Sequence, residues 1–139
     1  MSSPSESISK GRVSSYFNIN PIIRFFDSPK VARDKVSHYV SKGQRVADIA
    51  CNTGYYTLLL AECVGPEGKV YSIDLDPEVI KLVQEKVRKS GFTNIDLRNA
   101  NAADLNFIED HSIDFVLANG LIWSMLDSRP LAVSEIKRI

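Results

Sequence analysis

The sequence has no excess of either charge and no long apolar run. Its 139 residues carry 17 Lys plus Arg and 17 Asp plus Glu, so the formal net charge is zero. A neutral chain has no broad field to attract a nucleic acid backbone or an anionic membrane surface, and we expect neither as a partner. No stretch approaches the roughly 18 apolar residues of a membrane span, and the N-terminus does not resemble a signal peptide. We therefore expect a cytoplasmic protein.

Cysteine and histidine are also scarce. Cys51 and Cys63 do not have the spacing of a metal or redox motif, and His38 and His111 are each isolated in the sequence. We expect two reduced, half-buried thiols and two histidines that lie on the surface or pack against other side chains. The sequence therefore predicts no metal site, and the catalytic residues are unknown.

Composition divides the chain into a tail and one domain. Residues 1–15 contain seven serines and little that a core would bury, so we expect a flexible tail. Residues 16–26 are apolar enough to pack against a domain, and a packing arm is favoured over a substrate lid. Residues 16–139, this segment included, have the length and the apolar content of a single domain.

Helical and strand patterns alternate from residue 28 onward. Helices are predicted at 28–43, 55–63, 76–91 and 128–139, and strands at 45–50, 69–73, 95–98 and 113–118. Ser28 and Asp76, each followed by proline, have the pattern of helix caps, and Gly43 and Gly91 have that of helix stops. This alternation predicts an α/β fold, a doubly wound and mostly parallel sheet with helices on both faces.

In such sheets the ligand lies beyond the carboxyl ends of the strands. The first strand ends in the small-residue turn 50–54, and the second strand ends at Asp74, 20 residues after Gly54. Small residues let the backbone approach a ligand, and an acid at this spacing accepts hydrogen bonds from ribose hydroxyls. The segment is not the dinucleotide G-x-G-x-x-G, because its only glycine is Gly54.

The run Val46-Ala47-Asp48-Ile49-Ala50-Cys51-Asn52-Thr53-Gly54 resembles the first motif, D-x-G-x-G-x-G, of the class I S-adenosylmethionine-dependent methyltransferases. Three later segments are similar to further motifs of that family, in the same order. They are 64–78 for the second strand and its ribose acid, 101–107 for the adenine side, and 112–119 for the fourth strand. The resemblance covers roughly residues 28–139.

This resemblance implies a Rossmann-like fold and S-adenosyl-L-methionine as cofactor, with S-adenosyl-L-homocysteine as product. The residues implied in cofactor binding are Asp48, Ala50, Asn52 and Gly54 at the methionine part, Asp74 at the ribose, Leu75, Asn101 and Ala102 at the adenine, and Asn119 near the sulfonium. Trp123 is implied on the substrate side, with a hydrophobic plug as the favoured alternative. Asp76 is favoured as a helix cap, and Asp104 is left open between an adenine-side role and a loop or cap acid.

Three residues depart from the family pattern. Ala50 and Asn52 replace two of the three family glycines, and Asn101 replaces the usual aspartate. We expect the methyl group of Ala50 to be absorbed and the side chain of Asn52 to be the larger obstacle, although asparagine tolerates left-handed backbone well. Asn101 keeps an acceptor and loses the charge. These departures predict weakened cofactor binding.

The family sheet has seven strands, whereas this sequence ends after the helix that follows the fourth strand. The resemblance therefore implies the N-terminal part of the family fold, with the fourth strand at an open edge. Because such an edge invites pairing, we expect a homo-oligomer or a partner chain that completes the sheet.

The methyl acceptor is expected to be a small molecule. No Pro-Pro-aromatic or Pro-Cys motif follows the fourth strand, which disfavours nucleobase acceptors. Two alternatives stay open: a non-catalytic interaction subunit or half-domain, and a module that binds nicotinamide or another nucleotide.

Overall fold

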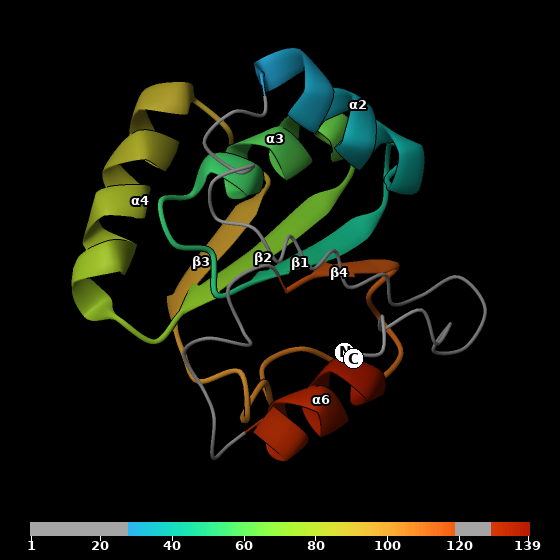
Figure 1. Cartoon of the computed structure of the whole chain (residues 1–139), viewed down its shortest axis with the longest axis vertical. Coiled ribbons are helices and arrows are strands. Elements are labelled where there is room, and N and C mark those ends of the chain that lie inside the picture. Colours follow the sequence, from blue (N-terminus) through green and yellow to red (C-terminus); the bar gives the residue numbers. More distant parts are fainter. Residues whose placement is uncertain (1–27, 119–128) are drawn as a thin grey trace.

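The computed structural model describes residues 28–118 and 129–139, which form a four-stranded parallel sheet with helices on both faces (Figure 1). The predicted α/β fold is confirmed. In chain order the elements are α2 (Pro29–Tyr39), β1 (Arg45–Ile49), α3 (Tyr55–Val64), β2 (Lys69–Asp74), α4 (Pro77–Ser90), β3 (Ile95–Asn99), β4 (Phe115–Leu117) and α6 (Arg129–Arg138). The predicted tail 1–15, the arm 16–26 and the residues Asn119 and Trp123 lie outside the described residues.

The strand order is β3-β2-β1-β4. The chain moves outward from β1 through β2 to β3 and then returns to the other side of β1, where Val46 pairs with Val70 on one side and with Phe115 on the other. Strand order therefore reverses at β1. A doubly wound sheet binds its ligand at the carboxyl end of this switch point, which here is the turn after Ile49.

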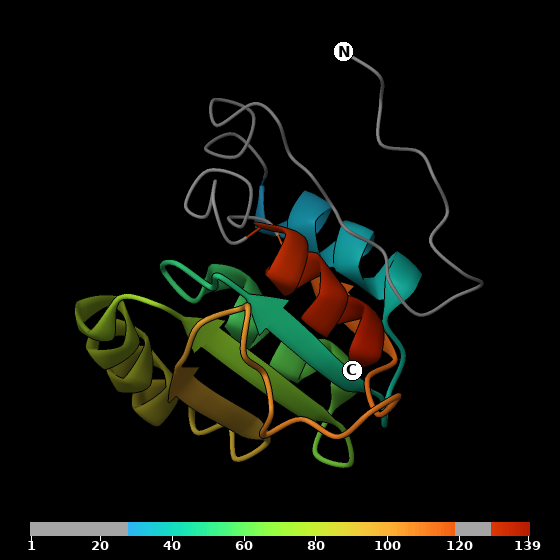
Figure 2. The same cartoon turned by 90° about the horizontal axis from the view of Figure 1, so that it is seen from below.

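Side chains alternate between two apolar clusters, one on each face of the sheet. Helices α2, α3 and α4 lie on one face and α6 on the other (Figure 1), and Figure 2 shows α6 from its own side. The α2/α3 face buries Val46, Val70, Phe115 and Leu117 with Ala32, Val36, Leu59, Leu60 and Val64. The α6 face buries Ala47, Ile49, Tyr71, Ile73 and Val116 with Leu105, Ile108, Ala132, Ile136 and Ile139.

Local signals predicted three of the helix ends correctly. The Ser28 hydroxyl accepts from the Val31 amide, the Asp76 carboxylate accepts from the Glu78 amide, and Gly91 has the left-handed conformation that ends α4. The preference for Asp76 as a helix cap is confirmed. The negative charge of the Asp76 carboxylate also interacts favourably with the positive N-terminal end of the helix dipole.

The prediction that the first helix ends at Gly43 is wrong. Helix α2 ends at Tyr39, because Val40 is extended and is buried at 5% exposure in the α2/α3 cluster. Gly43 lies in the following turn, with φ +83 and its amide bonded to the Val64 carbonyl. Tertiary packing of Val40 thus ends the helix earlier than the glycine pattern predicts.

The fourth strand is also shorter than the predicted 113–118. Strand β4 covers Phe115–Leu117, whereas the Ile113 amide is bonded to the Ile139 carbonyl at the end of α6. Glu135 and Arg138 tie α6 further to the segment before β4. The Glu135 carboxylate accepts from the Leu105 amide at 2.6 Å, and the Arg138 guanidinium donates to the Leu105 and Ile108 carbonyls.

Candidate functional site

The turn after β1 has a left-handed backbone at every second residue. The φ angles are +60 at Ala50, +50 at Asn52 and +75 at Gly54. Two non-glycine residues thus occupy a region that favours glycine. Ala50 has no polar side chain to offset this cost. The replacement of glycine by Ala50 is therefore unfavourable because of backbone strain, rather than because of the added methyl group that the sequence suggested. For the free energy of folding, Ala50 is the more costly departure of the two.

Gly54 is required for a second reason. A Cβ built on it would lie 2.7 Å from Cγ1 of Val83, which is fully buried on α4. The turn therefore passes against α4 at a distance that only glycine allows. Gly54 is also the residue before α3 and has no side chain to cap it, so the first amides of α3 face the turn without a side-chain acceptor.

Asp74 joins this turn to the one after β2. Its Oδ2 accepts from the Asn52 amide at 3.0 Å, and its Oδ1 accepts from the Asp76 amide at 3.0 Å. A carboxylate has about four lone-pair sites, so further acceptor positions are left for ligand hydroxyls. The neighbouring Leu75 is 57% exposed and offers an apolar surface at the same edge.

Asn99, at the end of β3, supports the same loop and was missed in the sequence. Its side-chain amide donates to the carbonyls of Asp74 at 3.0 Å and Leu75 at 2.8 Å. The Ala100 amide also donates to the Asp74 carbonyl. The signal was an asparagine at the end of a strand, but its partners depend on the register that pairs Asp74 with Asn99.

Lys86 on α4 was also missed. Its ammonium donates to the Thr53 carbonyl at 2.7 Å, so one cation from a distant part of the sequence holds the middle of the turn. The turn is thereby fixed from two sides, by Asp74 through Asn52 and by Lys86 through Thr53.

Asp48 lies beneath the turn rather than at its surface. It is 2% exposed, and its Oδ2 accepts from the Thr57 hydroxyl at 2.7 Å. Thr57 also shares a 2.7 Å hydrogen bond with the Ser72 hydroxyl. These three buried polar side chains join β1, α3 and β2 directly below the site, where the hydroxyls compensate for part of the cost of burying the carboxylate.

The two cysteines are free, as expected. Cys51 is buried rather than half-buried, and burial, with Asp48 nearby, raises the pKa of its thiol to about 12. Burial also raises the pKa of Cys63, which is half-buried. A thiol with a raised pKa is a poor nucleophile, so Cys51 lines the turn without being reactive.

In the segment predicted for the adenine side, the Asn101 side-chain oxygen accepts from the Ala103 amide at 2.9 Å and is therefore already engaged in a local turn. Ala102 is buried at 5% exposure, and Asp104 is an exposed loop residue whose amide bonds the Asn101 carbonyl. The structure thus places 50–54, 74–75 and 101–102 at the carboxyl ends of three strands.

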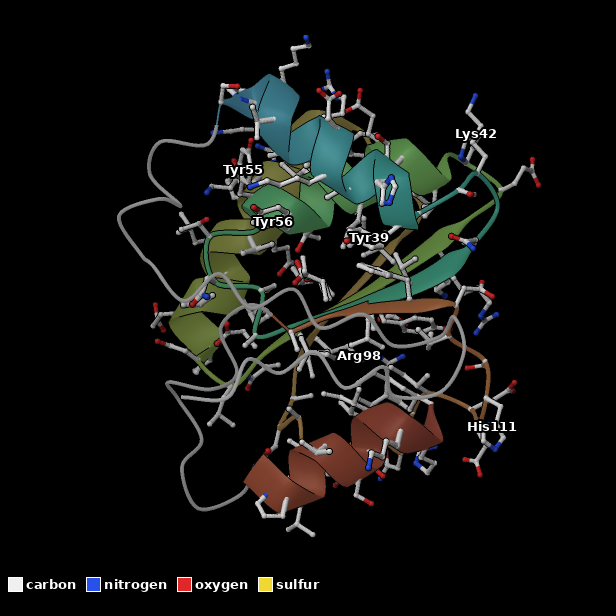
Figure 3. The ribbon with its side chains drawn as sticks, turned by 45° about the vertical axis from the view of Figure 1, so that its right-hand side comes forward. Tyr39, Lys42, Tyr55, Tyr56, Arg98 and His111 are labelled. Atoms are coloured by element: carbon white, nitrogen blue, oxygen red, sulfur yellow. The ribbon has the colours of Figure 1, made fainter. Side chains whose placement is uncertain are left out.

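The histidines do not join this edge. His38 and His111 are both exposed, and Figure 3 shows His111 far from Tyr55 and Tyr56, which begin α3 beside the turn. In residues 28–118 and 129–139 no three His, Cys, Asp or Glu side chains are grouped to hold a metal ion. No helix within that part of the chain is long and apolar enough to cross a membrane.

Residues 40–139 match the family model described as a methyltransferase domain, which is well over half of the chain. The chain belongs to this methyltransferase-domain family. The prediction made from the four motifs is thereby confirmed at the level of family and fold.

Among curated proteins, the methyltransferase domain is similar to a demethylmenaquinone methyltransferase of Geobacillus stearothermophilus. The two are 38% identical over 102 residues, which are 73% of this chain and 43% of the relative. The chain therefore spans less than half the length of this relative.

Among solved structures, a SAM-dependent methyltransferase from Aquifex aeolicus superposes with a TM-score of 0.67 at 27% identity, over 84% of this chain and 64% of that one. The cyclase SpnF superposes with a TM-score of 0.66 at 22% identity, over 76% of this chain and 39% of that one. The second likeness concerns the fold alone, and a fold does not by itself fix a reaction.

Proposed function

We propose that the methyltransferase domain binds S-adenosyl-L-methionine and transfers its methyl group to a small-molecule acceptor. The observation that carries this proposal is the Asp74 carboxylate at the end of β2, which bonds the Asn52 amide in the switch-point turn after β1 of a family-matched domain. The Aquifex aeolicus structure, described as a SAM-dependent methyltransferase, supports the choice of cofactor.

The residues present fit this cofactor. Unused lone pairs on Asp74 suit the two ribose hydroxyls, and the exposed Leu75 suits one face of the adenine. The first amides of α3 suit the carboxylate of the methionine part, because a helix N-terminus favours an anion. Ala102 would hold the adenine edge through its backbone. The Asn101 side-chain oxygen already accepts from the Ala103 amide and would have to accept from the adenine as well.

When bound, the cofactor supplies an activated methyl group on a sulfonium. The chain's own contribution is therefore orientation and exclusion of water rather than covalent chemistry. In this proposal Asp48 acts from below, through Thr57, to hold α3 and the turn in place. Asn119 and Trp123 remain predictions for the sulfonium and substrate sides.

The acceptor class is proposed on two grounds. The curated relatives are named for demethylmenaquinone, a small molecule, and a chain of zero net charge has no field for a nucleic acid. We propose an acceptor of that general size. A cytoplasmic location remains a prediction, in keeping with two free cysteines.

Isothermal titration tests the proposal. The full chain should bind S-adenosylhomocysteine with a dissociation constant in the micromolar range and should not bind NAD under the same conditions. Binding of NAD in preference would favour the nucleotide-module alternative instead. Micromolar binding would justify incubation with labelled cofactor and a panel of small quinones and phenols, in which labelled product is the readout.

A second candidate is a domain that binds cofactor poorly and serves as an interaction subunit. The left-handed backbone at Ala50 and Asn52, where the family has glycine, favours it. A folded chain that binds no S-adenosylhomocysteine would support this candidate. Light scattering during the same titration would test the predicted homo-oligomer or partner chain, and a compact cooperative monomer would contradict that prediction.

A further inference from the structure

The loop that carries Asp74 and Leu75 is held by hydrogen bonds rather than by apolar packing. Leu75 is 57% exposed, and Asp76 and Pro77 are exposed as well. An exposed side chain contributes little burial energy to fix its own position. The position of this loop therefore depends on the polar contacts that its backbone makes.

Asn99 supplies two of those contacts. Its side-chain nitrogen lies 3.0 Å from the Asp74 carbonyl and 2.8 Å from the Leu75 carbonyl, so one amide group holds two successive peptide units. An NH₂ group has two hydrogens, and both are used here. The strand register makes this possible, because Asn99 is the residue of β3 that pairs with Asp74 of β2.

The Asp74 carboxylate then passes this constraint to the turn after β1. It accepts from the amides of Asn52 and Asp76, at 3.0 Å each. Its orientation depends on the backbone that follows Asp74, and Asn99 fixes that backbone by holding the peptide units on either side of Leu75 at their carbonyls. Asn99 thus acts on the ligand-facing groups through the backbone.

We propose that Asn99 is a positioning residue for the adenosine half of the cofactor. This inference rests on the proposed function and goes beyond it, since it assigns a role to a residue outside the family motifs quoted above. Asn99 itself does not contact the cofactor; it holds the Asp74 carboxylate for the ribose and Leu75 for the adenine.

The test compares two ligands on variants of the full chain. S-adenosylhomocysteine contains both the adenosine thioether and an amino acid, whereas 5′-methylthioadenosine keeps the adenosine thioether and lacks the amino acid. Asn99→Asp keeps the shape of the side chain, removes both donors and places a carboxylate against two carbonyls. Asn99→Ala removes the donors without adding charge and serves if Asn99→Asp does not fold. Gln84→Glu, the same amide-to-carboxylate change at an exposed position of α4, is the control.

We expect Asn99→Asp to raise the dissociation constants of both ligands by a common factor of about ten, with Asn99→Ala somewhat less affected and Gln84→Glu unchanged. A merely structural role would lower the melting temperature and leave the affinity of the folded protein unaltered. Wild-type affinity in a folded Asn99 variant, or a loss confined to S-adenosylhomocysteine, would overturn this inference and leave the proposed function standing. A wild-type chain that binds neither ligand would overturn both.

Discussion

The Asp74 carboxylate accepts a hydrogen bond from the Asn52 amide at 3.0 Å, and so the acid at the end of β2 fixes the turn at the end of β1. A second bond, from the Asp76 amide, fixes the start of α4. One side chain thus couples the two loops that flank the candidate site. The acid therefore has a structural role in the chain before any ligand is bound.

We predict that Asp74→Ala lowers both stability and cofactor affinity. Loss of two hydrogen bonds to a charged acceptor should reduce the free energy of unfolding by about 1–2 kcal/mol, given partial exposure. Loss of the proposed ribose acceptor should weaken S-adenosylhomocysteine binding by at least about tenfold. Denaturant unfolding and calorimetric titration measure the two effects. Asp34→Ala, at an exposed position on α2, is the control and should change neither. Unchanged affinity in Asp74→Ala would exclude Asp74 as the ribose acid.

Gly54 and Gly43 provide a matched pair for the cost of a side chain in the turn. Both have positive φ, +75 and +83, but only at Gly54 would a Cβ meet Val83, at 2.7 Å. Gly43→Ala should cost about 1 kcal/mol from backbone strain alone. Gly54→Ala should cost about 3 kcal/mol, because close packing is added to the same strain. Equal losses in the two variants, measured by urea unfolding, would show that α4 adjusts without cost.

Ala50 should respond to substitution in the direction opposite to an ordinary alanine. Its φ of +60 is unfavourable for alanine, so Ala50→Gly should raise the free energy of unfolding by about 1 kcal/mol. Ala61→Gly, within α3, should instead lower it by at least about 1 kcal/mol. Thermal unfolding of both variants gives the sign of each effect. A loss of stability in Ala50→Gly would contradict the assignment of strain to this residue.

Asn52→Gly separates stability from binding in the same turn. Because asparagine tolerates the left-handed region, this change should alter stability by only a few tenths of a kcal/mol. Removal of the side chain from the expected approach of the cofactor carboxylate should tighten S-adenosylhomocysteine binding, as titration would show. Unchanged or weaker binding would mean that the Asn52 side chain is no obstacle.

The sequence predicted the parts of this fold that short-range patterns determine. Ser28 and Asp76 cap helices because their side chains reach amides two or three residues away, whereas the ribose role of Asp74, inferred from its distance to Gly54, stays a prediction. Gly43 was misjudged because the end of α2 depends on burial of Val40, which is a tertiary contact.

Other features of the site were not predicted from the sequence. The strain at Ala50 was not predicted, since alanine rarely adopts positive φ. Asn99 and Lys86 were missed because their partners lie 24 to 33 residues away.

We expect low pH to weaken the contact between α6 and the segment before β4, because this contact includes the carboxylate of Glu135. The Arg138 guanidinium, with the Leu105 amide, lowers the pKa of Glu135 below its ordinary value of 4.5 against the opposing effect of burial. A group whose pKa is lower in the folded state stabilises the fold above its unfolded pKa, and that stabilisation is lost as pH falls through the folded value. The contribution of Glu135 is therefore complete above about pH 5 and declines below pH 4.5.

We predict that Glu135→Gln loses about 1–2 kcal/mol of unfolding free energy at pH 7 and has a flatter dependence of stability on pH between 3 and 5. Glu67→Gln, in an exposed turn, should follow the wild-type curve, and parallel curves for wild type and Glu135→Gln would show that Glu135 does not carry the acid response.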